Sequence, residues 1–267
     1  MRSEAPIAQM RPWFSCKPAP IFNPEAWRGP THDAAVPSRA QGKRDWLLGE
    51  DEGALLALAR AVELRDRRTA SHCERVAFLG VAIGMAMQFS RARLAALYQG
   101  GYLHDVGKVG IPDAILHKAG GLSAEEWSIM RTHPACGEAI CRPVASFGPA
   151  LPLIRHHHER GDGNGYPDGL RASQIPIEAR VLQVADIYDA LTSARPHKPA
   201  YTPAQSLQML RDEAKCGWRD MEVVEVLGKM HGSGLPGIGA MAPPGQDLDG
   251  MRSSLDGLRA MVESTAG

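Results

Sequence analysis

Apolar residues recur every three or four positions through the middle of the chain, a spacing that predicts helices. A first helix has a broad apolar face made of Leu55, Leu56, Leu58, Ala59, Val62 and Leu64. Further apolar series follow at about 72–88 and from about 91 to 103. No stretch shows the alternation of apolar and polar residues that marks a half-buried strand. We therefore expect an all-α fold.

Capping residues, glycines and prolines divide the rest of this region into further helices. Ser123 and Glu126 have the spacing of a capping box, which places a helix start at this point. The glycine-dense loop 160–170 cannot be helical. Further helices are expected from His133, from about 149 to 158, between Pro176 and Pro196, and at about 203–213 and 219–231.

The two ends of the chain differ in composition from this helical middle. Residues 1–45 are rich in proline and lack any period, so we expect an N-terminal arm that is partly disordered. Residues 236–267 read as a Gly/Pro linker followed by a short amphipathic helix or a frayed tail. The folded domain is expected at 46–235, and both ends are expected to be dispensable for its function.

Composition excludes several classes of protein. The 30 basic and 30 acidic residues give a formal net charge of 0, so no overall field attracts a nucleic-acid polymer or a membrane surface. No run approaches the roughly 18 apolar residues of a membrane span. The N-terminus lacks the apolar core of a secretory signal. Any anionic ligand must therefore be held by local charges.

The five cysteines are odd in number and lack the spacing of a disulfide framework, which favours a reducing cytoplasm as the location. Cys136 and Cys141 lie close to His133 and raise the alternative of a zinc site. Their spacing fits no usual zinc pattern, so small buried residues on a helix are the favoured interpretation.

The candidate chemistry centres on His104 and Asp105, which follow directly on a strongly apolar helix. A desolvated carboxylate is costly unless it is paired or bound to metal. Alone, such a pair would more often be a hydrogen-bonded helix end, but further residues of the same types occur along the chain: His72, His133, His157, His158 and Asp186. Imidazole and carboxylate are ligands expected for Fe, Mn, Zn or Ni. The pattern predicts a metal site built from several helices.

These residues belong to an ordered series of motifs that includes His-Asp-Val-Gly-Lys at 104–108 and Gly-Asn-Gly-Tyr-Pro at 163–167. The other matching segments are 63–66 with Thr69 and His72, 111–113, 133–137, 157–160, 175–176, 179–180, 184–186, 188–192 and 195–196. Over about residues 55–230 the chain resembles the HD-GYP phosphodiesterases, a branch of the HD superfamily of metal-dependent phosphohydrolases. The resemblance implies an HD-superfamily helical bundle with a metal centre in its core.

The resemblance also implies an activity and a role for individual residues. The implied activity is hydrolysis of the bacterial messenger cyclic di-GMP to pGpG, GMP or both, with two divalent ions as cofactors. The implied metal ligands are His72, His104, Asp105, His133, His157, His158 and Asp186. Asp105 would bridge the two ions and Lys108 would lie beside the scissile phosphate. Tyr166 would lie over the pocket, and Arg195 and Lys198 would hold the nucleotide phosphates.

Three departures from the family pattern modify this picture. Arg68 stands where members with three metals carry a glutamate, so we expect two ions. Gly161 replaces a larger residue and is expected to loosen the loop. His197 stands where an aromatic residue is common and would make phosphate binding depend on pH.

Two alternatives stay open beside this function. The chain could hydrolyse another cyclic dinucleotide or phosphoester, or it could bind the nucleotide, or signalling proteins such as diguanylate cyclases, without turnover. The intact set of ligand-type residues and Lys108 favour the enzyme.

Overall fold

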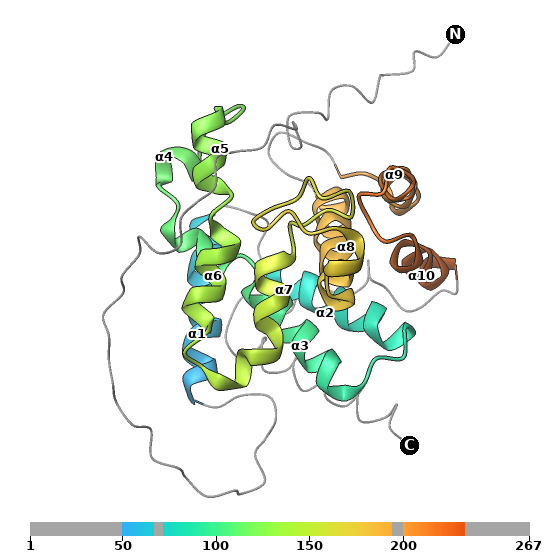
Figure 1. Cartoon of the computed structure of the whole chain (residues 1–267), viewed down its shortest axis with the longest axis horizontal. Helices are drawn as coiled ribbons and strands as arrows, with labels where there is room; N and C mark the ends of the chain where they lie inside the picture. Colours follow the sequence, from blue (N-terminus) through green and yellow to red (C-terminus); the bar gives the residue numbers. More distant parts are fainter. Residues whose placement is uncertain (1–49, 67–71, 194–199, 233–267) are drawn as a thin grey trace, which may run out of the picture. The chain divides into compact units, whose positions relative to one another are not determined.

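Helices make up nearly all the regular structure in the computed structural model, which describes residues 50–66, 72–193 and 200–232 (Figure 1). The predicted all-α class is confirmed for these residues, which contain one isolated β-bridge, between Asp162 and Arg171, and no strand. The α-helices are α1 (Glu50–Arg65), α2 (His72–Ala86), α3 (Arg91–Leu103), α4 (Asp113–Leu116), α5 (Ala124–Met130), α6 (His133–Cys141), α7 (Leu151–His156), α8 (Ile177–Thr192), α9 (Pro203–Lys215) and α10 (Met221–Gly232). Three 3-10 turns join them: η3 (Val106–Gly110), η4 (Ala145–Ala150) and η5 (Ala172–Gln174).

The core forms where α2 packs against α3 and α8. Eleven of the 15 residues of α2 are buried, and Val76 and Ile83 are fully inaccessible to solvent. Leu97 and Leu103 of α3 and Leu182 of α8 are equally inaccessible. Burial of this many aliphatic side chains makes these three helices the rigid support of the molecule. The paired helices α9 and α10 pack on α8 (Figure 1).

A second set of contacts brings the His-Asp motif to the start of α6. The 3-10 turn η3 follows Asp105 directly and packs along α6, which in turn packs on α7 (Figure 1). Gly107 makes this approach possible, because a Cβ atom there would lie 1.9 Å from the carbonyl oxygen of His133. Asp105 and His133 are therefore placed side by side by backbone packing.

Most predicted elements are present, and the capping box of Ser123 and Glu126 is confirmed at the start of α5. Two expectations were wrong in detail. Leu64 was counted on the apolar face of the first helix, but it is 64% exposed because Ala59 and Val62 form the buried face. The helix expected from about 149 to 158 begins as the 3-10 turn η4 and ends at His156, so His157 caps α7 and His158 lies beyond it.

Several expectations concern residues outside the described ranges. These are the N-terminal arm, the C-terminal linker and tail, and the residues Arg68, Arg195, His197 and Lys198. Among the helices that are described, none combines the length and apolar character needed to cross a membrane.

Candidate metal centre

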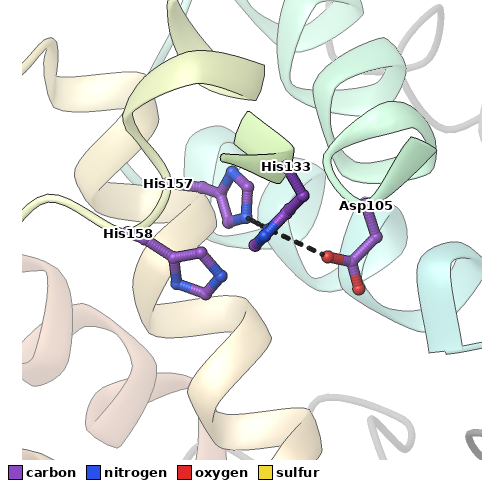
Figure 2. Close-up of side chains that lie close together, drawn as sticks. All are labelled: Asp105, His133, His157 and His158. Carbon is purple, nitrogen blue, oxygen red and sulfur yellow. Dashed lines mark hydrogen bonds and ion pairs between the residues drawn. The ribbon is translucent and has the colours of Figure 1, made fainter. Parts of the chain in front are cut away.

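The seven predicted ligands converge in two groups in the core. Asp105, His133, His157 and His158 form the first group (Figure 2), and His72, His104 and Asp186 form the second. Within each group, one ligand atom from every residue lies within 4.8 Å of the others. The ligand atoms come from α2, α6, α8 and the ends of α3 and α7, so the site exists only when these helices are packed.

Asp105 joins the two groups. Its Oδ1 lies 3.4 Å from Nε2 of His133 in the first group, and its Oδ2 lies 3.4 Å from Nε2 of His104 in the second. Figure 2 shows His133 between Asp105 and His157, and the Nε2 atoms of the two histidines are 3.3 Å apart. A carboxylate with one oxygen facing each group is placed as a bridging ligand would be.

Three of the histidines are oriented by carbonyl groups at helix ends. In each case Nδ1 donates to the carbonyl oxygen of the residue three positions earlier. That carbonyl lies in the last turn of a helix, where carbonyl groups have no hydrogen-bond partner within the helix. The pairs are His104 with Gly101 at 2.7 Å, His133 with Met130 at 2.8 Å and His157 with Ile154 at 2.8 Å. With its proton on Nδ1, each ring presents the lone pair of Nε2 to the site, as metal-binding histidines do.

His72 is oriented by a carboxylate instead. Its Nδ1 donates to Oδ2 of Asp189 at 2.7 Å, and Asp189 in turn accepts two hydrogen bonds from Arg75. The opposite nitrogen, Nε2, lies 3.3 Å from Oδ1 of Asp186. The roles of Asp189 and Arg75 were not predicted from the sequence. Their spacing does point to a shared site. Asp189 follows Asp186 by three residues and Arg75 follows His72 by three, which places each pair on one helix face.

The donor set fits a cation. The Nε2 atoms of His72 and His104 are buried and have no hydrogen-bond partner, although buried nitrogens are normally bonded. The first group offers three imidazoles and a carboxylate, and the second offers two imidazoles and a carboxylate. Borderline-soft divalent ions such as Fe, Mn, Zn and Ni suit both sets.

Burial controls the protonation of the histidines in the first group. Loss of solvent lowers the pKa of His133 and His158 well below the usual value and that of His157 to about 4. These rings are neutral at physiological pH and able to donate a lone pair. For Asp186, burial opposes ionisation, but the ring of His72 at 3.3 Å and the nearby His104 and His158 hold the pKa of the carboxyl well below its usual range. These four groups therefore need not lose protons before they bind a cation.

For the metal-free protein, we expect the free energy of unfolding to be greatest near pH 6.5. Because the folded-state pKa of His157 is about 4, this residue contributes fully to the free energy of unfolding above pH 6.5. The contribution is lost as the pH falls toward 4. Burial lowers the pKa of His72, but the adjacent carboxylates of Asp186 and Asp189 outweigh burial and raise it to about 9. That contribution is complete below pH 6.5 and is lost as the pH rises toward 9. Urea denaturation of chelator-treated protein at several pH values between 4 and 9 measures the slope of the free energy of unfolding against pH on each side of pH 6.5. His72→Gln should remove the alkaline slope alone, and an unchanged slope would contradict the assignment.

Asp189→Asn should weaken metal binding about 10- to 100-fold, the usual effect of losing a partner that orients a metal-ligating histidine. The amide cannot give both His72 and Arg75 the anionic acceptor that they share. The affinity for Mn²⁺ can be measured by competition with a chromogenic chelator. Asp212→Asn, a change of the same type on the exposed face of α9, is the matched control. Equal affinities in the two variants would show that Asp189 does not orient His72.

Lys108 is buried against the carboxylate of Asp105. It is only 2% exposed, and its Nζ donates to Oδ2 of Asp105 at 2.7 Å and to Oδ2 of Asp66 at 3.0 Å. A charge can be buried here because two carboxylates compensate it. Asp66 was noted in the sequence only as part of a motif, and no spacing reveals that the end of α1 reaches Lys108.

Tyr166 covers one side of the first group. Its ring lies 4.8 Å from the ring of His158 and 6.4 Å from that of His133, measured between centroids. The Tyr166-Pro167 peptide bond is cis, and the backbone N–H of Tyr166 donates to the carbonyl of His158 at 3.2 Å. The predicted position of Tyr166 over the site agrees with this geometry, while its role in substrate binding stays a prediction.

The loop that carries Tyr166 is held firmly, which corrects the expectation for Gly161. A Cβ atom at Gly161 would lie 2.5 Å from the carbonyl oxygen of Gly217, and the N–H of Gly161 donates to the carbonyl of Trp218 at 3.2 Å. Glycine therefore allows the loop to dock closely on the α9–α10 turn. It tightens the loop at this point, where a larger side chain would separate the two segments.

A third group of possible ligands, His156, Glu159 and Asp168, has a structural use. Glu159 is fully buried and accepts hydrogen bonds from the backbone N–H groups of residues 168, 169 and 170. Asp168 accepts two hydrogen bonds from Arg155. These contacts close the glycine-dense loop on α7. A cation here would have to compete with the guanidinium of Arg155, so the geometry does not favour a metal.

Cys141 agrees with the favoured interpretation of a small buried residue on a helix, whereas Cys136 on the same helix is only half-buried. Cys141 is buried on α6, where burial raises the pKa of its thiol to about 12, and none of the described ligand groups contains a cysteine.

Comparison with known proteins identifies the family. A family model described as HD domain matches residues 57–223, which is more than half of the chain. The chain belongs to the HD domain family. The membership predicted from the motifs is thereby confirmed, and metal dependence is a property of HD domains.

This HD domain has relatives that are named as phosphodiesterases. It is 41% identical over 158 residues to the cyclic di-GMP phosphodiesterase response regulator RpfG of Xanthomonas campestris, a match that covers 58% of this chain and 42% of the relative. It is 42% identical over 140 residues to a cyclic di-GMP phosphodiesterase of Thermotoga maritima, with 51% and 38% covered. It is 39% identical over 150 residues to the 3'3'-cGAMP-specific phosphodiesterase 2 of Vibrio cholerae, with 55% and 29% covered. The chain thus spans less than half the length of these relatives.

A solved structure shares the fold. The cyclic GMP-AMP-specific phosphodiesterase V-cGAP3 of Vibrio cholerae superposes with a TM-score of 0.53 at 19% sequence identity, covering 68% of this chain and 49% of the other. At this level of identity the likeness concerns the helical architecture of the HD domain.

Proposed function

We propose that this HD domain is a metal-dependent phosphodiesterase that hydrolyses cyclic di-GMP to pGpG, GMP or both. The observation that carries the proposal is Asp105, whose two oxygens face two groups of buried ligands while Lys108 donates to the same carboxylate. Relatives named for cyclic di-GMP hydrolysis at 36–42% identity support the choice of substrate.

The ligands proposed for the ions are the seven residues of the two groups. Bound divalent ions would activate a water molecule and neutralise the negative charge that protects a phosphodiester from attack. The protein's own contribution is position and fixed charge. Four histidines are oriented by partners of their Nδ1 atoms, so the Nε2 ligand atoms already face the site before an ion binds.

The remaining proposed roles belong to residues around the centre. Lys108 is proposed to hold a non-bridging oxygen of the scissile phosphate, because its ammonium already lies 2.7 Å from the bridging carboxylate. Tyr166 is proposed to contact the nucleotide from above His158. Arg195 and Lys198 are proposed as phosphate contacts on the motif resemblance, and both lie outside the described residues.

The substrate is tested by a panel of hydrolysis rates. Cyclic di-GMP, 3'3'-cGAMP, cyclic di-AMP and bis(p-nitrophenyl) phosphate would be compared with protein purified without oxygen and supplied with Mn²⁺ or Fe²⁺. We expect the greatest kcat/KM with cyclic di-GMP, and product analysis separates pGpG from GMP. A preference for 3'3'-cGAMP would support the second candidate, which rests on relatives specific for that nucleotide. Binding of cyclic di-GMP without product from any substrate would support the non-catalytic alternative.

We further propose two ions per chain. The described residues supply two groups of ligands, and a guanidinium at position 68 cannot replace the carboxylate that a third ion would require. Elemental analysis of anaerobically purified protein should therefore give about two transition-metal ions per chain, and Arg68→Glu is the variant expected to raise the ratio. Three ions per wild-type chain at full occupancy would refute this count.

A further inference from the structure

Arg131 lies beside the candidate metal centre, and none of the carboxylates in the described residues forms an ion pair with it. It caps the C-terminus of α5, two residues before His133, and its backbone N–H donates to the carbonyl of Trp127 at 3.0 Å. Its Nε is buried and has no hydrogen-bond partner, and among the described residues no acidic group forms an ion pair with it. Arginine side chains that lose solvent normally gain an anion in exchange.

Aromatic rings hold this guanidinium toward the site. Its central carbon lies 5.5 Å from the ring centroid of Tyr166 and 5.9 Å from that of Trp127, both within the range of cation–π attraction. The ring of Tyr166 lies 4.8 Å from that of His158 at an interplanar angle of 31°. A single aromatic ring thus separates the guanidinium of Arg131 from a candidate metal ligand.

The chemistry of the proposed substrate provides the missing anion. A cyclic dinucleotide is a ring closed by two phosphodiesters, and only one of them can lie on the metal centre at a time. The other carries a full negative charge and is kept at a short, fixed distance by the ring. A guanidinium is suited to such a phosphate, because its planar fork can donate two parallel hydrogen bonds.

We infer that Arg131 binds the phosphate of the cyclic dinucleotide that is not being hydrolysed, and that Tyr166 and Trp127 orient it for this contact. The inference rests on the proposed function. Arg131 is then a binding residue that favours diesters with a second phosphate over simple diesters. The competing reading is that Arg131 only joins two aromatic rings and stabilises the loop.

Two variants and two substrates separate these readings. Arg131→Met keeps an apolar stem for the rings and removes the charge, while Arg131→Lys keeps the charge and removes the fork. Arg142→Met is the matched control, since Arg142 lies at the opposite end of α6, is 65% exposed and pairs with Glu138. The substrates are cyclic di-GMP, which has two phosphates, and bis(p-nitrophenyl) phosphate, which has one.

With Arg131→Met we expect the KM for cyclic di-GMP to rise about 10- to 100-fold, the range expected for loss of a charge-assisted contact. Its kcat/KM for bis(p-nitrophenyl) phosphate and its metal content should equal those of the wild type. The KM of Arg131→Lys for cyclic di-GMP should lie between those of the wild type and Arg131→Met. The kinetic constants of Arg142→Met should match those of the wild type with both substrates.

Three results would overturn the inference. An unchanged KM for cyclic di-GMP would leave Arg131 with a structural role only. An equal decrease in kcat/KM for both diesters, or a decrease in metal content, would show that Arg131 acts on the centre through Tyr166. A loss of binding with cyclic di-GMP but not with cyclic di-AMP would show that Arg131 recognises a guanine base. Wild-type protein that hydrolyses bis(p-nitrophenyl) phosphate but no cyclic dinucleotide would instead refute the proposed function, and the inference with it.

Discussion

Asp105→Ala is expected to abolish phosphodiesterase activity and to reduce metal content while the helices persist. The carboxylate faces both groups of ligands, so its removal takes a shared anionic ligand from each and leaves the ions' positive charges without compensation. Loss of a residue that merely orients a ligand costs about 10- to 100-fold in activity or affinity, so loss of a shared ligand should cost more than about 100-fold.

The measurement is kcat/KM for cyclic di-GMP together with elemental analysis and far-UV circular dichroism. Asp105→Asn tests the charge separately from the shape, because the amide keeps the volume but loses the anionic oxygen. Asp212→Ala on the exposed face of α9 is the matched control and should behave as the wild type. Turnover by Asp105→Ala at the wild-type rate would exclude a mechanism based on this centre.

Gly107→Ala is expected to lower the free energy of unfolding by about 3 kcal/mol or more, at the upper end of the range for overpacked sites. An added Cβ atom would lie 1.9 Å from the carbonyl oxygen of His133 and 2.4 Å from the backbone nitrogen of Gly137. Both atoms belong to the backbone of α6, which cannot give way as a flexible side chain could. Any relief must move α6, and with it His133, away from Asp105.

Urea denaturation measures this effect, and metal affinity should fall in the same variant. Gly110→Ala is the matched control in the same 3-10 turn, because its Cβ atom would meet only the sulfur of Cys136 at an ordinary distance of 3.5 Å. We expect Gly110→Ala to change the free energy of unfolding by no more than about 0.5 kcal/mol. Equal stabilities of the two variants would mean that η3 and α6 are not in the close contact described.

The helices and the residues of the centre could be predicted from the sequence for different reasons. The helices follow from local patterns, such as the apolar spacing of α2 and the capping box of Ser123 and Glu126. The ligand residues were recognised by type and by their order in the motifs. Neither source gives distances, so the division of the seven residues into two groups joined by Asp105 required the structure.

The contacts that orient the ligands could not be predicted, because they depend on helix ends. Three histidines use carbonyls of the last turn of α3, α5 and α7, and the exact end of a helix is the least certain part of a sequence prediction. The partnership of Lys108 with Asp66 joins residues 42 positions apart. The prediction that Gly161 loosens the loop was wrong because the carbonyl group that Gly161 approaches, that of Gly217, lies far along the chain.

The most direct test of a metal-dependent centre in this HD domain is the rate of cyclic di-GMP hydrolysis as Mn²⁺ is returned to chelator-stripped protein. The proposed function predicts no product from the stripped protein, and a rate that rises with added Mn²⁺ until about two ions per chain are bound. Unchanged turnover by the fully stripped protein would contradict the account, and so would the absence of product at every Mn²⁺ concentration.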